Sequence, residues 1–262
     1  MTAQDPILTH CEGPLATITL NRPQRRNALD LAMWQGLREA VEALDRNQAL
    51  RVAIIRGAGT EAFASGADIA EFDSVRASPA DGRNYDAIVD LACAAIARAR
   101  LPFIAMIHGF CMGGGLMIAA SCDFRFAADD ARFAVPAARL GIAYPLSGVR
   151  DLMALASPSM AKDMLMSARI VAAAEAFGTG LADRVLPKAE LESATREFAD
   201  LIAANAPLTI AAAKASVRAL RTGNDYDLSL ARAMSARAYA SNDFEEGRKA
   251  FLERRPPFFT GQ

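Results

Sequence analysis

The chain has 262 residues, 52% of them hydrophobic, which suits a single domain near the upper size limit with a sizeable buried core. Its formal net charge of −1, without a basic stripe, argues against nucleic acid as a partner. The four scattered cysteines and two histidines lack the spacing of a metal site, so we expect reduced thiols and no bound metal.

The N-terminal segment has no apolar stretch behind a basic head, so we expect no signal peptide and a cytoplasmic location. Residues 101–122 are apolar over a length that resembles a membrane span. Pro102, His108 and four glycines interrupt this stretch. It therefore predicts a strand, a turn and a buried helix, and we expect no membrane partner.

The first third of the chain alternates between strand and helix patterns. Residues 15–20 alternate as a strand does, and Asn21-Arg22-Pro23 ends it. Asp30 is the expected N-cap of a helix that runs to about Arg46, with apolar residues at helical spacing. Residues 51–56 predict a buried strand. This order predicts a crossover connection and parallel pairing of the two strands.

Small-residue turns follow at 63–68 (Phe-Ala-Ser-Gly-Ala-Asp) and at 109–115 (Gly-Phe-Cys-Met-Gly-Gly-Gly), and each leads into a helix. Backbone N–H groups at such turns are unpaired and point outward. Two turns that converge would form a pocket for a developing negative oxygen. For either turn alone, the simpler interpretation is a tight bend that permits close helix packing.

The remaining pattern predicts more strands and then mostly helices. Further strands are expected at 103–107, 123–127, 132–134 and 183–186, and helices at 84–99, from the glycine run through Ala120, and at 207–221, 228–239 and 244–253. Asp68 is expected to cap a short helix, and Asp123 to pair with an arginine.

Four motifs occur in order: Asn21-Arg22-Pro23 with Asn27-Ala28-Leu29, the turn at 63–68, the glycine run at 109–115, and Cys122-Asp123. With this order and spacing the chain resembles the enoyl-CoA hydratase/isomerase, or crotonase, superfamily from about residue 8 to residue 261. The resemblance implies an α/β fold, with a crotonase-type spiral of ββα turns over residues 1–200. It also implies a helical C-terminal trimerisation region over 201–262, in a homotrimer or a dimer of trimers.

The resemblance further implies an acyl-CoA substrate, with coenzyme A as part of that substrate and no separate cofactor. The oxyanion hole would consist of the backbone N–H groups of Ala67 and Gly114. Two fixed donors and a helix N-terminus suit an enolate oxygen. For CoA, the resemblance points to Arg25 or Arg26 near the phosphates, with Arg25 preferred. It also points to Ala64, Ser65 and Ala67 along the adenine and pantetheine, and to Lys249 from the C-terminal helices.

The chain departs from the family at the acid–base positions. The two hydratase glutamates fall on Met117 and Ala137, and the acid of some isomerases falls on Pro145. Residues 140–148 resemble the methylmalonyl-CoA decarboxylase branch, in which a tyrosine at the place of Tyr144 faces the substrate. That branch carries a histidine where this chain has Ala67. A packing aromatic with its hydroxyl on a carbonyl is an equally open role for Tyr144.

Decarboxylation of a substituted malonyl-CoA fits these departures, because loss of CO₂ creates the enolate without a base. Tyr144 or Ser147 would orient the carboxylate or help protonate the product. Two alternatives remain open. One is an enoyl-CoA hydratase or isomerase with a non-standard acid–base group, and the other is a non-catalytic acyl-CoA-binding homologue.

Overall fold

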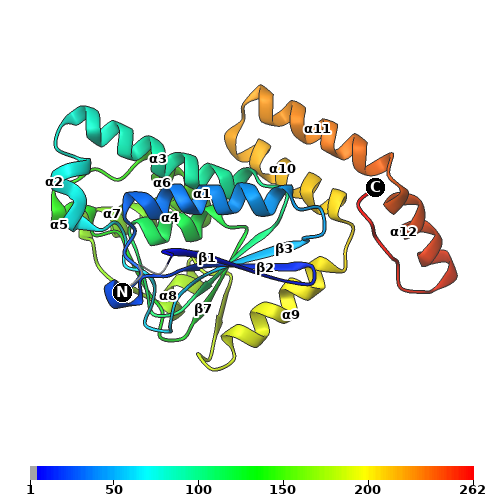
Figure 1. Cartoon of the computed structure of the whole chain (residues 1–262), viewed down its shortest axis with the longest axis horizontal. Coiled ribbons are helices and arrows are strands. Elements are labelled where there is room, and N and C mark those ends of the chain that lie inside the picture. Colours follow the sequence, from blue (N-terminus) through cyan, green and yellow to red (C-terminus); the bar gives the residue numbers. More distant parts are fainter. Residues whose placement is uncertain (1–4) are drawn as a thin grey trace.

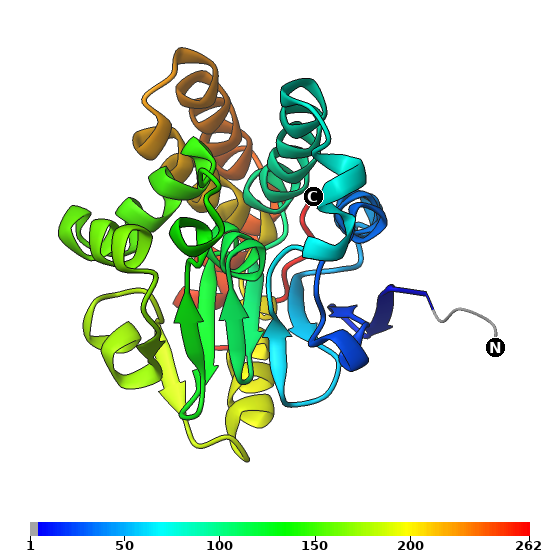
Figure 2. The same ribbon diagram turned by 90° about the vertical axis from the view of Figure 1, so that its left-hand side faces the viewer.

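The computed structural model describes residues 5–262 and contains two sheets beside a set of helices (Figure 1). The larger sheet has the strand order β1 (Ile7–Glu12), β2 (Leu15–Leu20), β3 (Val52–Gly57), β5 (Phe103–Ile107), β7 (Phe124–Ala128) and β10 (Arg184–Leu186). The smaller sheet has the order β4 (Ala62–Ala64), β6 (Phe110–Met112), β8 (Arg132–Ala134) and β9 (Val171–Ala172). Figure 2 shows the strands side by side beneath the helices.

The helical elements have the following bounds: η1 (Pro23–Arg25), α1 (Leu31–Arg46), η2 (Ile69–Glu71), α2 (Phe72–Val75), α3 (Pro79–Arg98), α4 (Gly114–Ser121), α5 (Ala137–Leu140), α6 (Leu146–Leu155), α7 (Pro158–Ser167), α8 (Ala173–Gly178), α9 (Leu191–Ala203), α10 (Pro207–Thr222), α11 (Asp225–Tyr239) and α12 (Asn242–Glu253). Helices α1, α3 and α4 cover one face of the larger sheet, and α9 covers the other (Figure 1).

The central strands are buried on both faces, as the fold requires of a parallel sheet between helices. In β3, Ala53 and Ile55 belong to the core cluster that includes α1, α3 and α4. Val52 and Ile54 belong to a second cluster with α9. The predicted crossover is confirmed, since β2 and β3 are parallel, with Leu15 opposite Val52.

The predicted strands and the capped helix α1 are confirmed to within about two residues. The Asp30 carboxylate accepts a hydrogen bond from the Met33 N–H at 2.8 Å. Helix α3, however, begins at Pro79 rather than at 84, because the Ser78 hydroxyl accepts a hydrogen bond from the Asp81 N–H. The strands β1, β4, β6 and β9 were not predicted.

The helix predicted from the glycine run is confirmed, since α4 begins at Gly114, but the short strand β6 forms earlier within residues 109–115. Gly109 has φ +53°, and a Cβ atom there would lie 1.8 Å from the Glu61 carbonyl oxygen. This close approach of two backbones aligns Phe110–Met112 between β4 and β8.

The expected arginine partner of Asp123 is wrong. The Asp123 carboxylate instead pairs with Lys214 of α10 at 2.8 Å and accepts a hydrogen bond from the Phe103 N–H at 2.8 Å. The Lys214 ammonium also donates to the carbonyl oxygens of Ile96 and Leu101. A partner 91 residues away has no local sequence signal.

Lys214→Ala is expected to lower the free energy of unfolding by roughly 3 kcal/mol, because it leaves a half-buried carboxylate and two carbonyls without their donor. Urea unfolding followed by circular dichroism measures this. The matched control is Lys188→Ala, which breaks an exposed pair with Asp130 and should cost less than about 1 kcal/mol. Equal losses in the two variants would contradict the prediction.

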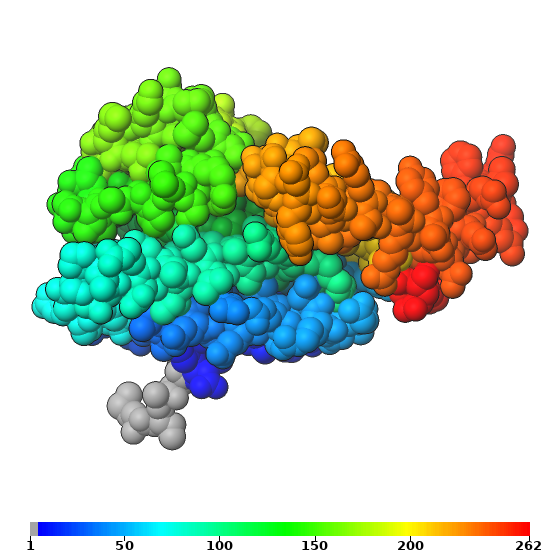
Figure 3. Space-filling model, turned by 90° about the horizontal axis from the view of Figure 1, so that it is seen from above, coloured from blue at the N-terminus to red at the C-terminus, as the bar shows by residue number. Residues whose placement is uncertain are grey.

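The last three helices, α10 to α12, extend away from the body of the chain (Figure 3). Large apolar side chains are exposed on them and on the tail: Val217, Leu220, Tyr239, Phe251, Leu252 and Phe258. Within residues 5–262, none of the helices is both long and apolar enough to cross a membrane.

Candidate active site

The two small-residue turns meet at one place in the structure. A Cβ atom at Gly113 would lie 3.9 Å from the Gly66 Cα atom, and a Cβ atom at Gly66 would lie 3.7 Å from the Gly114 nitrogen. Gly66 has φ +103° and Gly113 has φ +46°, conformations that L side chains rarely adopt. Glycine therefore permits both the bends and their contact.

The turn at 65–68 is held by the segment that follows β2. The Ser65 N–H donates to the Arg26 carbonyl at 3.0 Å. Leu29 donates to the Gly66 carbonyl and accepts from the Asp68 N–H, both at 2.8 Å. The first motif of the sequence, which ends at Leu29, therefore fixes the position of the turn at 63–68.

The side chains of Arg22 and Asn27 stabilise this arrangement of the two segments. The Arg22 guanidinium donates to the Ala28 carbonyl at 2.8 Å and to the Asp68 carboxylate at 2.9 Å. The Asn27 amide is fully buried and donates to the carbonyls of Ala58 and Ala62. As predicted, Asp68 also caps a short helical turn, η2. Both side chains of the motif thus serve the geometry of the turn.

The N–H groups of Ala67 and Gly114 have no hydrogen-bond acceptor among residues 5–262. Gly114 is the first residue of α4, where the helix leaves its N–H groups unpaired. Both residues line one cavity of about 90 Å³. The structure thus brings two free amide donors to the same hollow, at the N-terminus of a buried helix.

The rest of this cavity is mostly apolar. Met117 and Ala137 are buried and line it. Within the described chain, its wall has a single carboxylate, that of Asp86, which is paired with the Arg76 guanidinium at 2.5 Å. The positions expected to lack the family glutamates therefore do face the hollow, and no unpaired carboxylate replaces them there.

One side of the cavity is made by the end of α5 and the loop that follows it. Leu140 and Ala143 line the cavity from this side, and both are also exposed to solvent.

Tyr144 belongs to the same wall, but its hydroxyl is engaged. It donates to the Gly113 carbonyl at 3.1 Å. The ring packs on Gly148, where a Cβ atom would lie 2.6 Å away. Burial raises the pKa of Tyr144 well above its ordinary value, so the hydroxyl keeps its proton. This geometry is that of a side chain bracing the glycine turn, and a direct catalytic role for Tyr144 stays a prediction.

Ser147 is not among the residues that line the cavity. Its hydroxyl donates to the Asp90 carboxylate at 2.5 Å. The structure therefore does not bring Ser147 together with the two amides.

Sequence reasoning did not connect Tyr85 with Trp34. Both line the cavity, and the Trp34 indole N–H donates to the Tyr85 hydroxyl at 3.1 Å. Trp34 also packs against the glycine turn, since a Cβ atom at Gly114 would lie 2.9 Å from its ring. The two aromatics are 51 residues apart, and no motif links them.

A shallow surface groove adjoins the cavity, and Ser65 and Ala67 line both. Arg25 and Arg26 line the groove as well. The Arg26 guanidinium pairs with Glu61 at 2.7 Å, whereas the exposed Arg25 has, within the part of the chain that the structure describes, only a 3.7 Å contact with Asp68. Arg25 is therefore the freer of the two to bind an anion.

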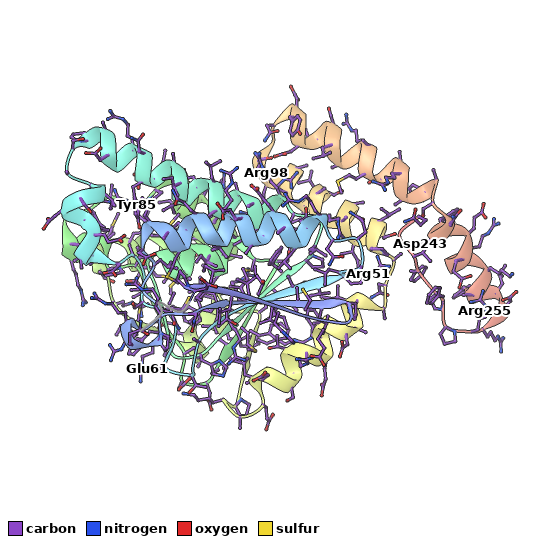
Figure 4. All side chains as sticks on the ribbon, in the orientation of Figure 1. Arg51, Glu61, Tyr85, Arg98, Asp243 and Arg255 are labelled. Carbon is purple, nitrogen blue, oxygen red and sulfur yellow. The ribbon has the colours of Figure 1, made fainter. Side chains whose placement is uncertain are left out.

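The structure does not bring Ala64 and Lys249 to this groove. Ala64 is fully buried against Gly115, whose Cβ atom would lie 2.6 Å from the Ala64 carbonyl oxygen. Lys249 is exposed on α12. Asp243 and Arg255 flank this lysine in the sequence, and Figure 4 labels both at the opposite end of the molecule from Tyr85. A contribution from Lys249 would have to come from another copy of the chain.

The model of the family described as "Enoyl-CoA hydratase/isomerase" matches residues 11–262. A crotonyl-CoA hydratase from Syntrophomonas wolfei is 34% identical over 258 residues, which cover 98% of each chain. A carnitinyl-CoA dehydratase from Salmonella arizonae is 35% identical over 259 residues, 95% of this chain and 96% of that one. The crystal structure of an enoyl-CoA hydratase/carnithine racemase from Magnetospirillum magneticum is 36% identical, with a TM-score of 0.93 over 99% of this chain and 97% of that one. The chain belongs to the enoyl-CoA hydratase/isomerase family.

Proposed function

We propose that this protein is an enzyme that converts an acyl-CoA thioester through an enolate held by the N–H groups of Ala67 and Gly114. Two amides without an acceptor among residues 5–262, one of them at the start of the buried helix α4, support this proposal. Donors fixed before the reaction stabilise developing negative charge at little reorganisation cost. The names of the relatives refer to CoA thioesters, which also supports the substrate class.

The most concrete form of the proposal is decarboxylation of a substituted malonyl-CoA. One observation carries it: the cavity joins two free amides to a wall without an unpaired carboxylate. When the bond to CO₂ breaks, its electron pair forms the enolate directly, so no base is needed. The apolar surroundings of Met117 and Ala137 disfavour the charged carboxylate of the substrate and thus favour neutral CO₂.

The CoA moiety is proposed to lie along the groove that continues from the cavity. Arg25 would meet the phosphates there, and Ser65 and Ala67 would contact the pantetheine. The proposed assembly is a homotrimer or a dimer of trimers, supported by the exposed apolar side chains of α10 to α12. Light scattering during size-exclusion chromatography measures the mass of the assembly directly.

A hydratase or isomerase reaction with a non-standard acid–base group is the second candidate. Asp86 favours it, because its carboxylate lines the cavity. The ion pair of Asp86 with Arg76 opposes this candidate, since the guanidinium already occupies the carboxylate. In this case hydration of crotonyl-CoA would be lost in Asp86→Asn.

The test is a panel of thioesters assayed together for CO₂, hydration and free thiol. We expect CO₂ from methylmalonyl-CoA or ethylmalonyl-CoA and little hydration of crotonyl-CoA. Fast hydration without CO₂ release would overturn the decarboxylase proposal. Binding of CoA thioesters without turnover would identify a non-catalytic homologue.

A further inference from the structure

Tyr85 is a buried residue of α3 that lines the cavity. Figure 4 marks it near the start of α1, the helix that carries Trp34. The Tyr85 oxygen accepts the Trp34 indole N–H at 3.1 Å. Its own proton has no acceptor among residues 5–262, so this proton remains available to a molecule in the cavity.

The other hydroxyls of the cavity wall are already engaged. The Ser65 hydroxyl donates to the Arg25 carbonyl at 3.4 Å, and Tyr144 donates to the Gly113 carbonyl. Tyr85 is therefore the cavity hydroxyl of the described chain with a free proton.

The Tyr85 hydroxyl is coupled to the proposed oxyanion hole through one side chain. The Trp34 ring that positions it also abuts Gly114. An acyl group held by the Gly114 amide extends into the cavity whose wall carries this hydroxyl. Trp34 is 1% exposed, and close packing limits its movement. The distance between the Tyr85 hydroxyl and the proposed oxyanion hole therefore stays nearly constant.

The surroundings of Tyr85 suit an acid that must keep its proton until it is used. Burial raises its pKa, with smaller increases from Glu71 and Asp86, and these effects outweigh the lowering by Trp34 and Arg76. The Arg76 guanidinium lies 4.5 Å above the Tyr85 ring, where a cation also stabilises a transient phenolate. Asp86 holds Arg76 in this position.

We propose that Tyr85 is the proton donor that completes the reaction, an inference that rests on the proposed decarboxylation. The bond to the carboxylate carbon breaks, CO₂ leaves, and the electron pair enters the enolate. The enolate α-carbon then takes the phenolic proton from one face, and the thioester carbonyl is restored. Water returns a proton to the phenolate.

The experiment follows the decarboxylation of methylmalonyl-CoA in D₂O and determines the configuration of the monodeuterated propionate after the product thioester is hydrolysed. The wild type is expected to give one enantiomer. Tyr85→Phe is expected to give a nearly 1:1 mixture, because water then reaches the enolate from either face. CO₂ release should fall less than about tenfold, since carbon–carbon cleavage precedes protonation.

The matched control is Val89→Ala, which alters the same wall one helical turn away and should keep the single enantiomer. Retention of one enantiomer at an unchanged rate in Tyr85→Phe would overturn the assignment while leaving the decarboxylase proposal intact. Loss of selectivity in Tyr144→Phe, with Tyr85→Phe still selective, would assign the proton to Tyr144 instead. If the wild type releases no CO₂, the proposed decarboxylation and the role of Tyr85 in it both fall.

Discussion

Gly114→Ala is expected to lower kcat at least about 10²-fold, with a much smaller change in KM. The new Cβ atom would lie 2.9 Å from the ring of Trp34, which is buried and held by its hydrogen bond to Tyr85. The start of α4 must therefore shift, and the Gly114 N–H moves away from the substrate oxygen. A displacement near 1 Å is enough for a loss of this size. The groove that would hold CoA is untouched, so binding persists.

The measurement is steady-state kinetics on the preferred thioester, with circular dichroism to verify the fold. Gly178→Ala is the control, because a Cβ atom there meets nothing within 4 Å and α8 is remote from the cavity. It should match the wild type. Normal turnover by Gly114→Ala would mean that its N–H does not contact the reacting oxygen, and the enolate proposal would fail with it.

The double variant Met117→Glu with Ala137→Glu is expected to exchange one reaction for another. Two carboxylates would face the cavity, where they repel the carboxylate of a malonyl-type substrate and favour its protonated form. CO₂ release should fall by about 10² or more. Hydration of crotonyl-CoA should appear, because each acid–base group contributes about 10²–10⁴-fold.

The matched control replaces the same two residues with glutamine, which has similar size and polarity but transfers no proton. It should lose CO₂ release less severely and gain no hydration. Both reactions are assayed on one preparation, by CO₂ capture and by loss of the enoyl absorbance. Undiminished CO₂ release in the glutamate variant would mean that Met117 and Ala137 do not border the reacting carboxylate.

The sequence predicted those parts of the fold whose signal is local. Asp30 could be recognised as a helix cap because the N–H group that donates to its carboxylate, that of Met33, is three residues away. The parallel pairing of β2 with β3 followed from the helix between them. Short strands such as β4 and β6 carry too few residues for a periodic pattern, and the contact of Gly109 with Glu61 creates their alignment.

For the site, the glycine turns and the positions without glutamate could be located by motif, and the structure brings these residues to one cavity. The partner of Asp123 and the bond between Trp34 and Tyr85 could not be predicted, because each interaction joins residues distant in sequence. The engagement of Tyr144 with Gly113 depends on how the loop after α5 folds back, which no local pattern encodes.

The solvent-exposed wall formed by Leu140 and Ala143 has a consequence for how this scaffold diversifies. Gly66 beside the Ala67 amide and Trp34 beside the Gly114 amide are buried, and most changes there carry a folding penalty. The two wall residues face water on one side and can vary at little such cost. New acyl preferences can therefore be acquired, by natural drift or in a mutant library, without dismantling the catalytic apparatus.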